Sequence, residues 1–317
     1  MNFTTFLILS PILIFLWSLF LLLRVIPIKL PPEIYSELEK KHALQRRKQR
    51  KKIEKTKVIL KRKGVVASFG RTVDGNHRVS LPLATNPTIL LCGLQGSGKS
   101  RMIESAILSI ASYTPNVEFR IMGSPKDVQY TTLVALPQKT TIALNEEDWD
   151  RTLKEVEKEM LLRAEKLAKA KMENPEIIDV ISMNEKSSEK IPYIILIADE
   201  LQRIVAKKLP KNREIVNHIL EQGRSVGIYF IGSTQVQTKE DLGGKIISKI
   251  GVKIAGQMAN SENSKIVLGK AGAEMLNPEK EEAIINSYNY PFTLFRPKRF
   301  SYKEIIKEIK EIKKLHS

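Results

Sequence analysis

The sequence contains very little cysteine and histidine. The 317 residues include one cysteine and four histidines, and the histidines do not lie at the spacing of a metal-ligand set. An internal disulfide framework and a zinc cluster are therefore excluded, and the body of the chain is typical of a cytosolic protein. Because Cys92 ends an apolar run, we expect it to be a small buried side chain and not a reactive thiol.

Charge is absent from the first 23 residues. A helix over 1–23 would measure about 35 Å, which is enough to cross a hydrocarbon core of about 30 Å. The segment has neither the basic start nor the small-residue cleavage site of a signal peptide. We predict a transmembrane helix over 1–23. All nearby positive charge follows it, so we expect a single-pass protein of the cell membrane with its N-terminus outside and the rest cytoplasmic.

Basic residues dominate the next segment, 24–63. It holds 15 Lys and Arg against 4 Asp and Glu, a net charge of +11, whereas the formal net charge of the whole chain is +17. A polybasic stretch beside a membrane span is attracted to an anionic membrane, and it is equally suited to nucleic-acid phosphates. We expect 24–63 to be a juxtamembrane segment and rank lipid ahead of nucleic acid.

Apolar runs alternate with helical patterns in the remainder of the chain. Residues 65–83 alternate around "DGN" and predict a β-hairpin, and six strands are expected at 88–92, 117–122, 141–144, 193–198, 227–232 and 251–256. Continuous apolar strands separated by helices indicate an α/β fold with a mostly parallel sheet. An apolar stripe predicts a helix whose core face carries Trp149, Leu153, Val156, Met160, Ala164 and Leu167. We expect one domain over 64–300 and a docked amphipathic helix over 301–317.

A glycine-rich loop follows the strand 88–92. The octapeptide "GLQGSGKS" satisfies the pattern G-x-x-x-x-G-K-[ST] between a strand and a helix, as phosphate binding requires. The lysine would neutralise phosphate charge and the final serine would ligate Mg²⁺. The predicted ATP-binding residues are Gly93, Leu94, Gln95, Gly96, Ser97, Gly98, Lys99 and Ser100.

Two more strand ends carry polar residues suited to nucleotide hydrolysis. "YIILIADE" ends in Asp199, expected to bind Mg²⁺, and Glu200, expected to polarise the attacking water. "GIYFIGSTQ" ends in Gln235, which can sense the γ-phosphate. Arg224 follows a predicted helix; it either caps that helix or reaches the γ-phosphate of a neighbouring subunit as an arginine finger, and the residues alone favour neither.

Together these motifs resemble the FtsK/SpoIIIE family of DNA translocases. The resemblance runs from about Gly70 to Leu276 and includes "SPKDVQYTTLVALP", "EMLLRAEKLA" and "SKIVLGKAGAEML". It implies a RecA-like P-loop NTPase and assigns Lys99 and Ser100 to ATP and Mg²⁺, Glu200 and Gln235 to catalysis, and Arg224 to a finger in trans. Ser124 stands where the family has Asp, and the family's Arg-Pro after the sensor glutamine is missing.

The resemblance also implies partners. It predicts a membrane-anchored ATPase that forms a homo-oligomer, a hexameric ring, and pulls DNA, with mobile-element (conjugative) DNA as the first expectation and a relaxase or secretion channel as a further partner. The alternative is an FtsK-like ATPase that powers protein secretion. A third hypothesis is a membrane-tethered ATP-dependent switch that moves nothing.

Overall fold

A ten-stranded sheet organises the part of the chain that the computed structural model describes, residues 64–235 and 244–317. The predicted membrane helix (1–23) and basic segment (24–63) lie outside the described residues. Within the described ranges, no helix combines the length and the apolar composition of a membrane span. In spatial order the strands are β2 (Arg78–Pro82), β1 (Val66–Thr72), β10 (Thr293–Pro297), β9 (Ala283–Asn286), β8 (Val252–Ala255), β3 (Thr88–Cys92), β7 (Ile228–Thr234), β6 (Tyr193–Ala198), β4 (Val117–Met122) and β5 (Thr140–Ala143).

The sheet has a parallel half and an antiparallel half. From β8 through β3, β7, β6 and β4 to β5 every neighbouring pair is parallel, which confirms the mostly parallel α/β prediction and all six expected strands to within two residues. Strands β9, β10, β1 and β2 continue the sheet in antiparallel pairs, and β1 with β2 is the expected hairpin. Sequence reasoning missed β9 and β10.

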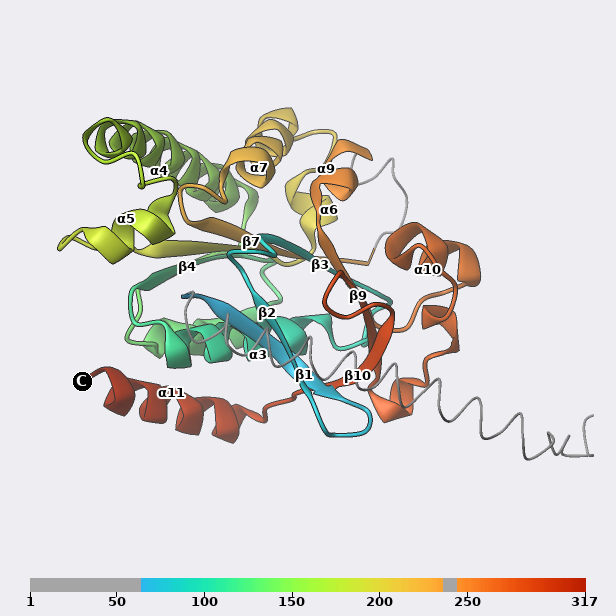
Figure 1. Ribbon diagram of the computed structural model, residues 1–317. Coiled ribbons are helices and arrows are strands. Elements are labelled where there is room, and N and C mark those ends of the chain that lie inside the picture. The colour runs from blue at the N-terminus through green and yellow to red at the C-terminus, as the bar shows by residue number, and fades with distance from the viewer. Residues whose placement is uncertain (1–63, 236–243) are drawn as a thin grey trace, which may run out of the picture. The chain divides into compact units, whose positions relative to one another are not determined.

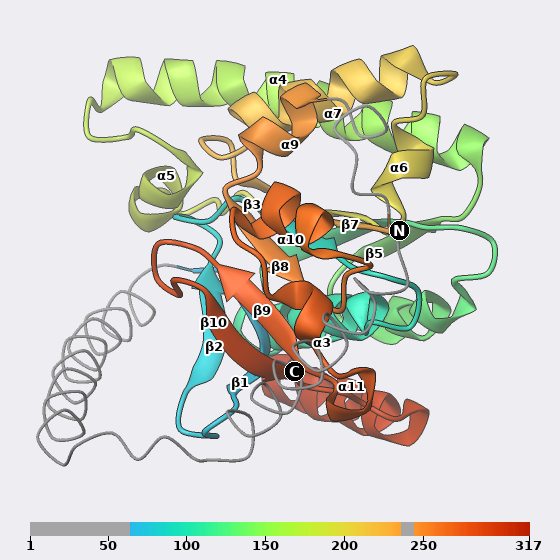
Figure 2. The same cartoon turned by 90° about the vertical axis from the view of Figure 1, so that its right-hand side faces the viewer.

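Helices cover both faces of the sheet (Figure 1). One face carries α3 (Lys99–Tyr113), the 3₁₀ segment η1 (Val128–Ala135) and α11 (Tyr302–His316). The other carries α4 (Glu146–Glu173), α6 (Leu201–Ile204), α7 (Pro210–Gln222) and α9 (Gly244–Lys249). The shorter α5 (Val180–Lys186), α10 (Ser261–Leu268), η2 (Ala273–Met275) and η3 (Pro278–Lys280) complete the unit. In the turned view, α10 and β9 lie in front of the parallel strands (Figure 2).

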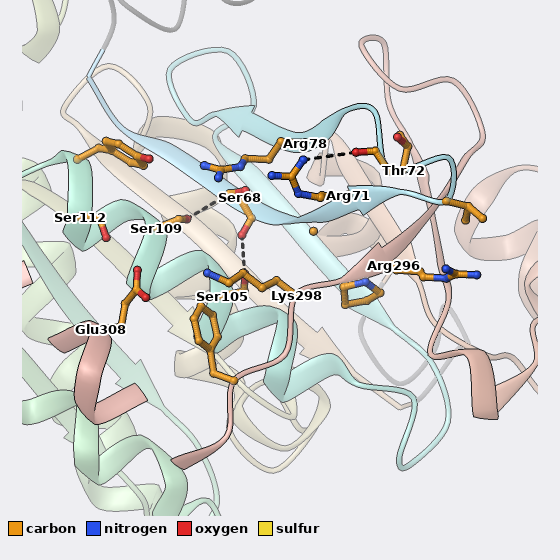
Figure 3. A pocket seen from close by; sticks show the side chains of 16 residues that line it. Ser68, Arg71, Thr72, Arg78, Ser105, Ser109, Ser112, Arg296, Lys298 and Glu308 are labelled. Atoms are coloured by element: carbon orange, nitrogen blue, oxygen red, sulfur yellow. Dashed lines mark hydrogen bonds between the residues drawn. The ribbon is translucent and has the colours of Figure 1, made fainter. Parts of the chain in front are cut away.

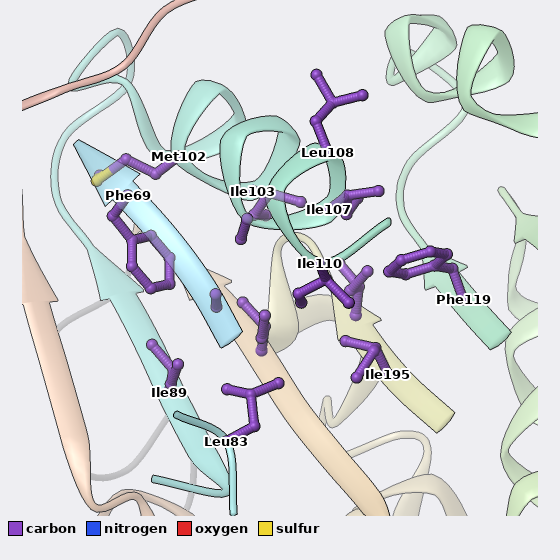
Figure 4. Packing of buried hydrophobic residues seen from close by; sticks show 14 of the residues in the cluster. Phe69, Leu83, Ile89, Met102, Ile103, Ile107, Leu108, Ile110, Phe119 and Ile195 are labelled. Carbon is purple, nitrogen blue, oxygen red and sulfur yellow. The ribbon is translucent and has the colours of Figure 1, made fainter. Parts of the chain in front are cut away.

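Each sheet face has its own apolar core. All six residues of β6 are buried, as expected for a strand covered on both faces. Figure 4 shows Ile103, Ile107 and Ile110 of α3 directed at the strands and Leu108 directed away from them. Because α11 packs on α3, Leu108 is buried as well, and the helix that begins at the glycine-rich loop is enclosed on two sides.

Two helix faces follow the sequence expectation with one exception. In α4, Trp149, Leu153, Val156 and Met160 are buried and Leu167 is half-buried against the core, but Ala164 is exposed. In α11, Ile305, Ile309 and Ile312 are buried and Ile306 is half-buried. A capping box between Ser301 and Glu304 starts this helix.

Candidate nucleotide-binding site

The polar residues of the motifs meet at the carboxyl edge of the parallel strands. The loops that follow β3, β4, β6 and β7 surround a cavity of about 530 Å³. Eight of the predicted site residues line it, namely Gln95, Gly96, Gly98, Lys99, Ser100, Asp199, Glu200 and Gln235. Ser124, Lys126, Asp127, Arg101, Arg203 and Arg299 complete the lining, and we call this space the nucleotide cavity.

The glycine-rich loop depends on backbone angles that favour glycine. Gly96 and Gly98 have φ angles of 80° and 89°, and Gly98 is the N-cap of α3. A Cβ on Gly93 would lie 2.5 Å from Ser97 Oγ, so the start of the loop is closely packed on its own serine. Gly93, Leu94 and Ser97 do not line the cavity. They shape the loop and present its N–H groups at the N-terminus of α3.

Lys99 is buried beneath this loop. Its Nζ donates to the carbonyl oxygens of Gly93 and Leu94, each at 2.9 Å, which uses two of the three ammonium donors. Burial lowers the pKa of Lys99, and the nearby Asp199 carboxylate opposes that shift. The third donor remains for an anion in the cavity.

Asp199 is the most extensively hydrogen-bonded carboxylate of the site. Its Oδ2 accepts from Tyr130 OH at 2.6 Å and from Ser100 Oγ at 3.1 Å, and its Oδ1 accepts from Ser233 Oγ and the Glu200 N–H. The side chains of Asp199 and Ser100 thus place two hard oxygen atoms together beside the glycine-rich loop, which is the donor chemistry that Mg²⁺ prefers. The residues present fit the predicted metal.

Glu200 adopts an unusual backbone conformation directly after β6. Its φ of 55° lies in the left-handed region, which turns its carboxylate toward the strand beside it. Gln235 Nε2 donates to Glu200 Oε1 at 3.0 Å, and Arg203 Nη1 lies 3.0 Å from Oε2. The structure therefore brings together the expected water-polarising carboxylate and the expected sensor amide.

A carboxylate follows the position at which the family's Asp is replaced. Ser124 is buried, and its N–H donates to Asp127 Oδ2 at 2.6 Å. Asp127 lines the nucleotide cavity three residues after Ser124. The departure in the motif thus leaves this wall of the cavity with an acidic group.

Arg224 lies far from its own nucleotide cavity. It is exposed in the turn that precedes β7, at the amino edge of the parallel strands, whereas the glycine-rich loop lies at their carboxyl edge. The C-cap of α7 is Gly223, and Arg224 follows it in this turn. The buried Arg163 of the "EMLLR" motif donates to the Val226 carbonyl at 3.2 Å and holds this turn in place.

Sequence reasoning missed several contributors to the site, of which Tyr130, Arg101 and Arg299 are the most distant from the predicted motifs. Tyr130 is fully buried in η1, and Arg101 and Arg299 line the cavity from α3 and from the link between β10 and α11. Arg101 also donates to the Phe300 carbonyl at 3.0 Å, and Arg299 pairs with Glu281. The quoted segment "SPKDVQYTTLVALP" contained Tyr130, but no pattern within it marks a tyrosine that bonds a carboxylate 69 residues later.

Comparison with known proteins gives a family match and several relatives. Residues 49–239 match the model described as the FtsK/SpoIIIE family. The DNA translocase FtsK of Borreliella burgdorferi is 26% identical over 263 residues, which cover 79% of this chain and 32% of the relative. The DNA translocase FtsK of Chlamydia trachomatis is 28% identical over 218 residues, covering 66% and 27%. The chain spans about a third or less of the length of these relatives.

Solved structures share the fold at low identity. A monomer form of the pCW3 conjugation coupling protein TcpA with ATPγS superposes with a TM-score of 0.68 at 18% identity, covering 80% of this chain and 71% of TcpA. The cytoplasmic domain of the Thermomonospora curvata type VII secretion ATPase EccC gives 0.66 at 19% identity, covering 78% and 31%. At these identities the likeness shows a common P-loop ATPase fold.

Proposed function

Because the chain belongs to the FtsK/SpoIIIE family, we propose that it is an ATP-driven DNA translocase. The observation that carries the proposal is the cluster at the carboxyl edge of the sheet, where Lys99, Ser100 and Asp199 lie beside Glu200 and Gln235. A loop that only stores a nucleotide does not need a carboxylate oriented by an amide next to it. DNA as the cargo is supported by the relatives named DNA translocase.

The loop residues supply the binding of ATP. The N–H groups at the start of α3 and the third donor of Lys99 favour the negative charge of the β- and γ-phosphates. Ser100 and Asp199 would hold Mg²⁺, directly or through water. When bound, Mg²⁺ neutralises charge that develops on the phosphate oxygens.

Glu200 is placed to act as the general base. Its carboxylate lines the nucleotide cavity and would accept a proton from the water that attacks the γ-phosphorus. Gln235 and Arg203 hold its two oxygens in position. A γ-phosphate that draws the Gln235 amide toward itself would change this contact, so Gln235 can report the bound nucleotide through β7.

The position of Arg224 supports the proposal that copies of the chain assemble into a ring. It lies at the sheet edge opposite the nucleotide cavity, so it acts on ATP only when one copy of the chain presents its amino edge to the carboxyl edge of the next. Contacts of that head-to-tail kind close into rings. We propose a homo-oligomeric ring, hexameric by family resemblance.

We propose that the protein works at the cell membrane. Residues 1–23 would anchor the chain in the cell membrane with the ATPase part cytoplasmic, and 24–63 would meet anionic lipid. Conjugative DNA, with a relaxase or secretion channel as a further partner, is the process we favour. Its support is the fold shared with TcpA.

The first experiment measures the ATPase rate of the full chain with duplex DNA, single-stranded DNA or an unfolded polypeptide. We expect DNA to stimulate hydrolysis, and we expect Glu200→Gln to lower the stimulated rate by about 100-fold or more. Stimulation by polypeptide and not by DNA would replace the proposal with protein export. A rate that no polymer changes would contradict translocation of either cargo.

A mixing experiment tests the arginine in trans. Lys99→Ala and Arg224→Ala should each abolish stimulated hydrolysis, while Lys169→Ala on the exposed part of α4 removes an equal charge as a control. An equal mixture of the two inactive variants should regain activity, because about one interface in four joins an intact cavity to an intact Arg224. A mixture as inactive as its components would refute this role of Arg224.

A further inference from the structure

A second cavity of about 530 Å³ lies beneath the β1–β2 hairpin, outside the nucleotide cavity. Its walls come from the hairpin, from the middle of α3, from the end of β10 and from α11. We call it the hairpin cavity. Figure 3 shows Arg71 and Arg78 side by side along one wall, and Lys298 and Glu308 along the opposite wall.

Two arginines of this cavity are direct cross-strand neighbours. Arg71 pairs with Arg78 in the register of β1 and β2, so both side chains project from the same face. Like charges directly opposite each other destabilise a sheet unless a counter-charge lies between them. Both side chains are exposed, so solvent reduces their repulsion, and an anion bound between them would remove it.

No carboxylate of the described residues compensates these arginines. Arg71 donates weakly to the Gly75 carbonyl at 3.4 Å, and the nearby Asp74 is engaged by Thr72 and Asn76. Arg296, the other cross-strand neighbour of Arg71, differs in having Glu282 at 3.6 Å. Of these three neighbouring arginines, Arg71 and Arg78 therefore have no carboxylate partner among the described residues and are available to an anionic ligand.

The opposite wall carries a third cationic side chain, Lys298, which packs on an aromatic ring. Lys298 Nζ lies 4.1 Å from the centre of the Phe300 ring and forms no ion pair within residues 64–235 and 244–317. Ser105 Oγ donates to the Ser68 carbonyl and Ser109 Oγ accepts from the Ser68 N–H, so β1 is fastened to α3 below the arginines. These bonds hold the backbone of the strand from which Arg71 projects, and a guanidinium group matches the oxygens of a phosphate.

We propose that the hairpin cavity binds a phosphate group through Arg71, Arg78 and Lys298. The phosphate comes either from the backbone of DNA or from a free polyphosphate such as a nucleotide. Glu308 is the single carboxylate that lines the cavity, and it weakens the binding of an anion. The DNA source rests on the proposed function, whereas the phosphate site itself does not.

The test uses tripolyphosphate as the probe. Its dissociation constant is measured by titration calorimetry at low salt in the full chain carrying Lys99→Ala, so that the nucleotide cavity contributes little. The pair Arg71→Gln with Arg78→Gln should weaken binding about tenfold or more, since each removes charge-assisted hydrogen bonds. The control pair Lys166→Gln with Lys169→Gln removes equal charge from the exposed part of α4 and should change it less than about twofold.

A variant that binds tripolyphosphate more tightly is needed as well, because misfolding can explain a loss of binding but not a gain. Glu308→Gln removes the opposing charge, so it should tighten tripolyphosphate binding about threefold. Equal dissociation constants in the arginine pair and the control pair would overturn the site. An unchanged or weaker affinity in Glu308→Gln would place the anion elsewhere and overturn it as well.

A second arm identifies the source of the phosphate. The same variants without Lys99→Ala are titrated into labelled duplex and single-stranded oligonucleotides. Weaker DNA binding in the arginine pair, with the control pair unaffected, supports the DNA backbone, while unchanged DNA binding together with lost tripolyphosphate binding supports a free polyphosphate. If the unaltered chain binds no DNA, the proposed function fails, and the tripolyphosphate titration still decides the site.

Discussion

Tyr130→Phe tests whether the buried hydroxyl group stabilises the site through Asp199. Tyr130 is fully buried, and its hydroxyl lies 2.6 Å from Asp199 Oδ2. Phenylalanine keeps the ring, so the substitution opens no large cavity. What is lost is one hydrogen bond to a carboxylate, which contributes about 1.5–3 kcal/mol.

The remaining donors reduce the expected loss. Asp199 still accepts from Ser100 Oγ, Ser233 Oγ and the Glu200 N–H, so the carboxylate is not left without partners. We expect the free energy of unfolding to fall by about 1.5–2 kcal/mol, equivalent to about 3–8 °C in Tm for a domain of this size. Urea titration at neutral pH measures it, with an unchanged m-value as the sign that the unfolded state is unaltered.

The same substitution predicts an alkaline pH dependence. Burial, followed by the charge of Asp199, raises the pKa of Tyr130 well above 10.0 in the folded chain. The unfolded chain ionises this tyrosine first, so the advantage of the unaltered chain over Tyr130→Phe is complete below pH 10 and decreases above it. Tyr302→Phe, on an exposed side chain, should change stability by less than about 0.5 kcal/mol. A Tyr130→Phe chain that matches this control would refute the reasoning.

Three further predictions concern other buried positions. Burial raises the pKa of Cys92 to about 12, so a thiol reagent should leave the folded chain unmodified and react with one thiol per chain in urea; reaction without denaturant would contradict this. Gly227→Ala should lower the free energy of unfolding by about 1–3 kcal/mol in urea titration, because φ is 74° there and a Cβ would lie 3.0 Å from Val180 Cγ1; a neutral effect would exclude strain. Burial raises the pKa of Glu104 above 4.5, so the ionised form destabilises the fold. Urea titrations at several pH values should therefore show Glu104→Gln gaining stability relative to the unaltered chain as the pH rises above 4.5. A stability difference that stays constant with pH would refute the shift.

The strand ends of the site could be predicted because two signals coincide there. The apolar runs before Gly93, Asp199 and Gln235 mark buried parallel strands, and the residues after such strands meet at one edge of the sheet. Arg224 comes before β7 in the sequence, so its position alone places it at the opposite edge of the sheet from Gly93, Asp199 and Gln235. The chemistry of the residues and the topology of the sheet thus point to the same place.

The remaining contributors lack such a signal. Tyr130 and Asp127 belong to a short 3₁₀ segment and the turn before it, where no apolar period places side chains. Strands β9 and β10 have four and five residues, and β10 pairs with β1, more than two hundred positions earlier in the chain. Arg299 reaches the nucleotide cavity only because of that pairing. Contacts so distant in sequence are fixed by the tertiary fold and not by local pattern.

In the ring proposed above, the separation of Arg224 from the glycine-rich loop would determine how many complete sites an assembly can contain. Where Arg224 completes the site of the next copy, an open row leaves one cavity at one end without an arginine and one arginine at the other end without a cavity. Closing the row into a ring supplies the missing pair at once. Hydrolysis per chain would then rise with protein concentration and level off when closure is complete, so the ATPase rate itself would report the assembly of the proposed ring.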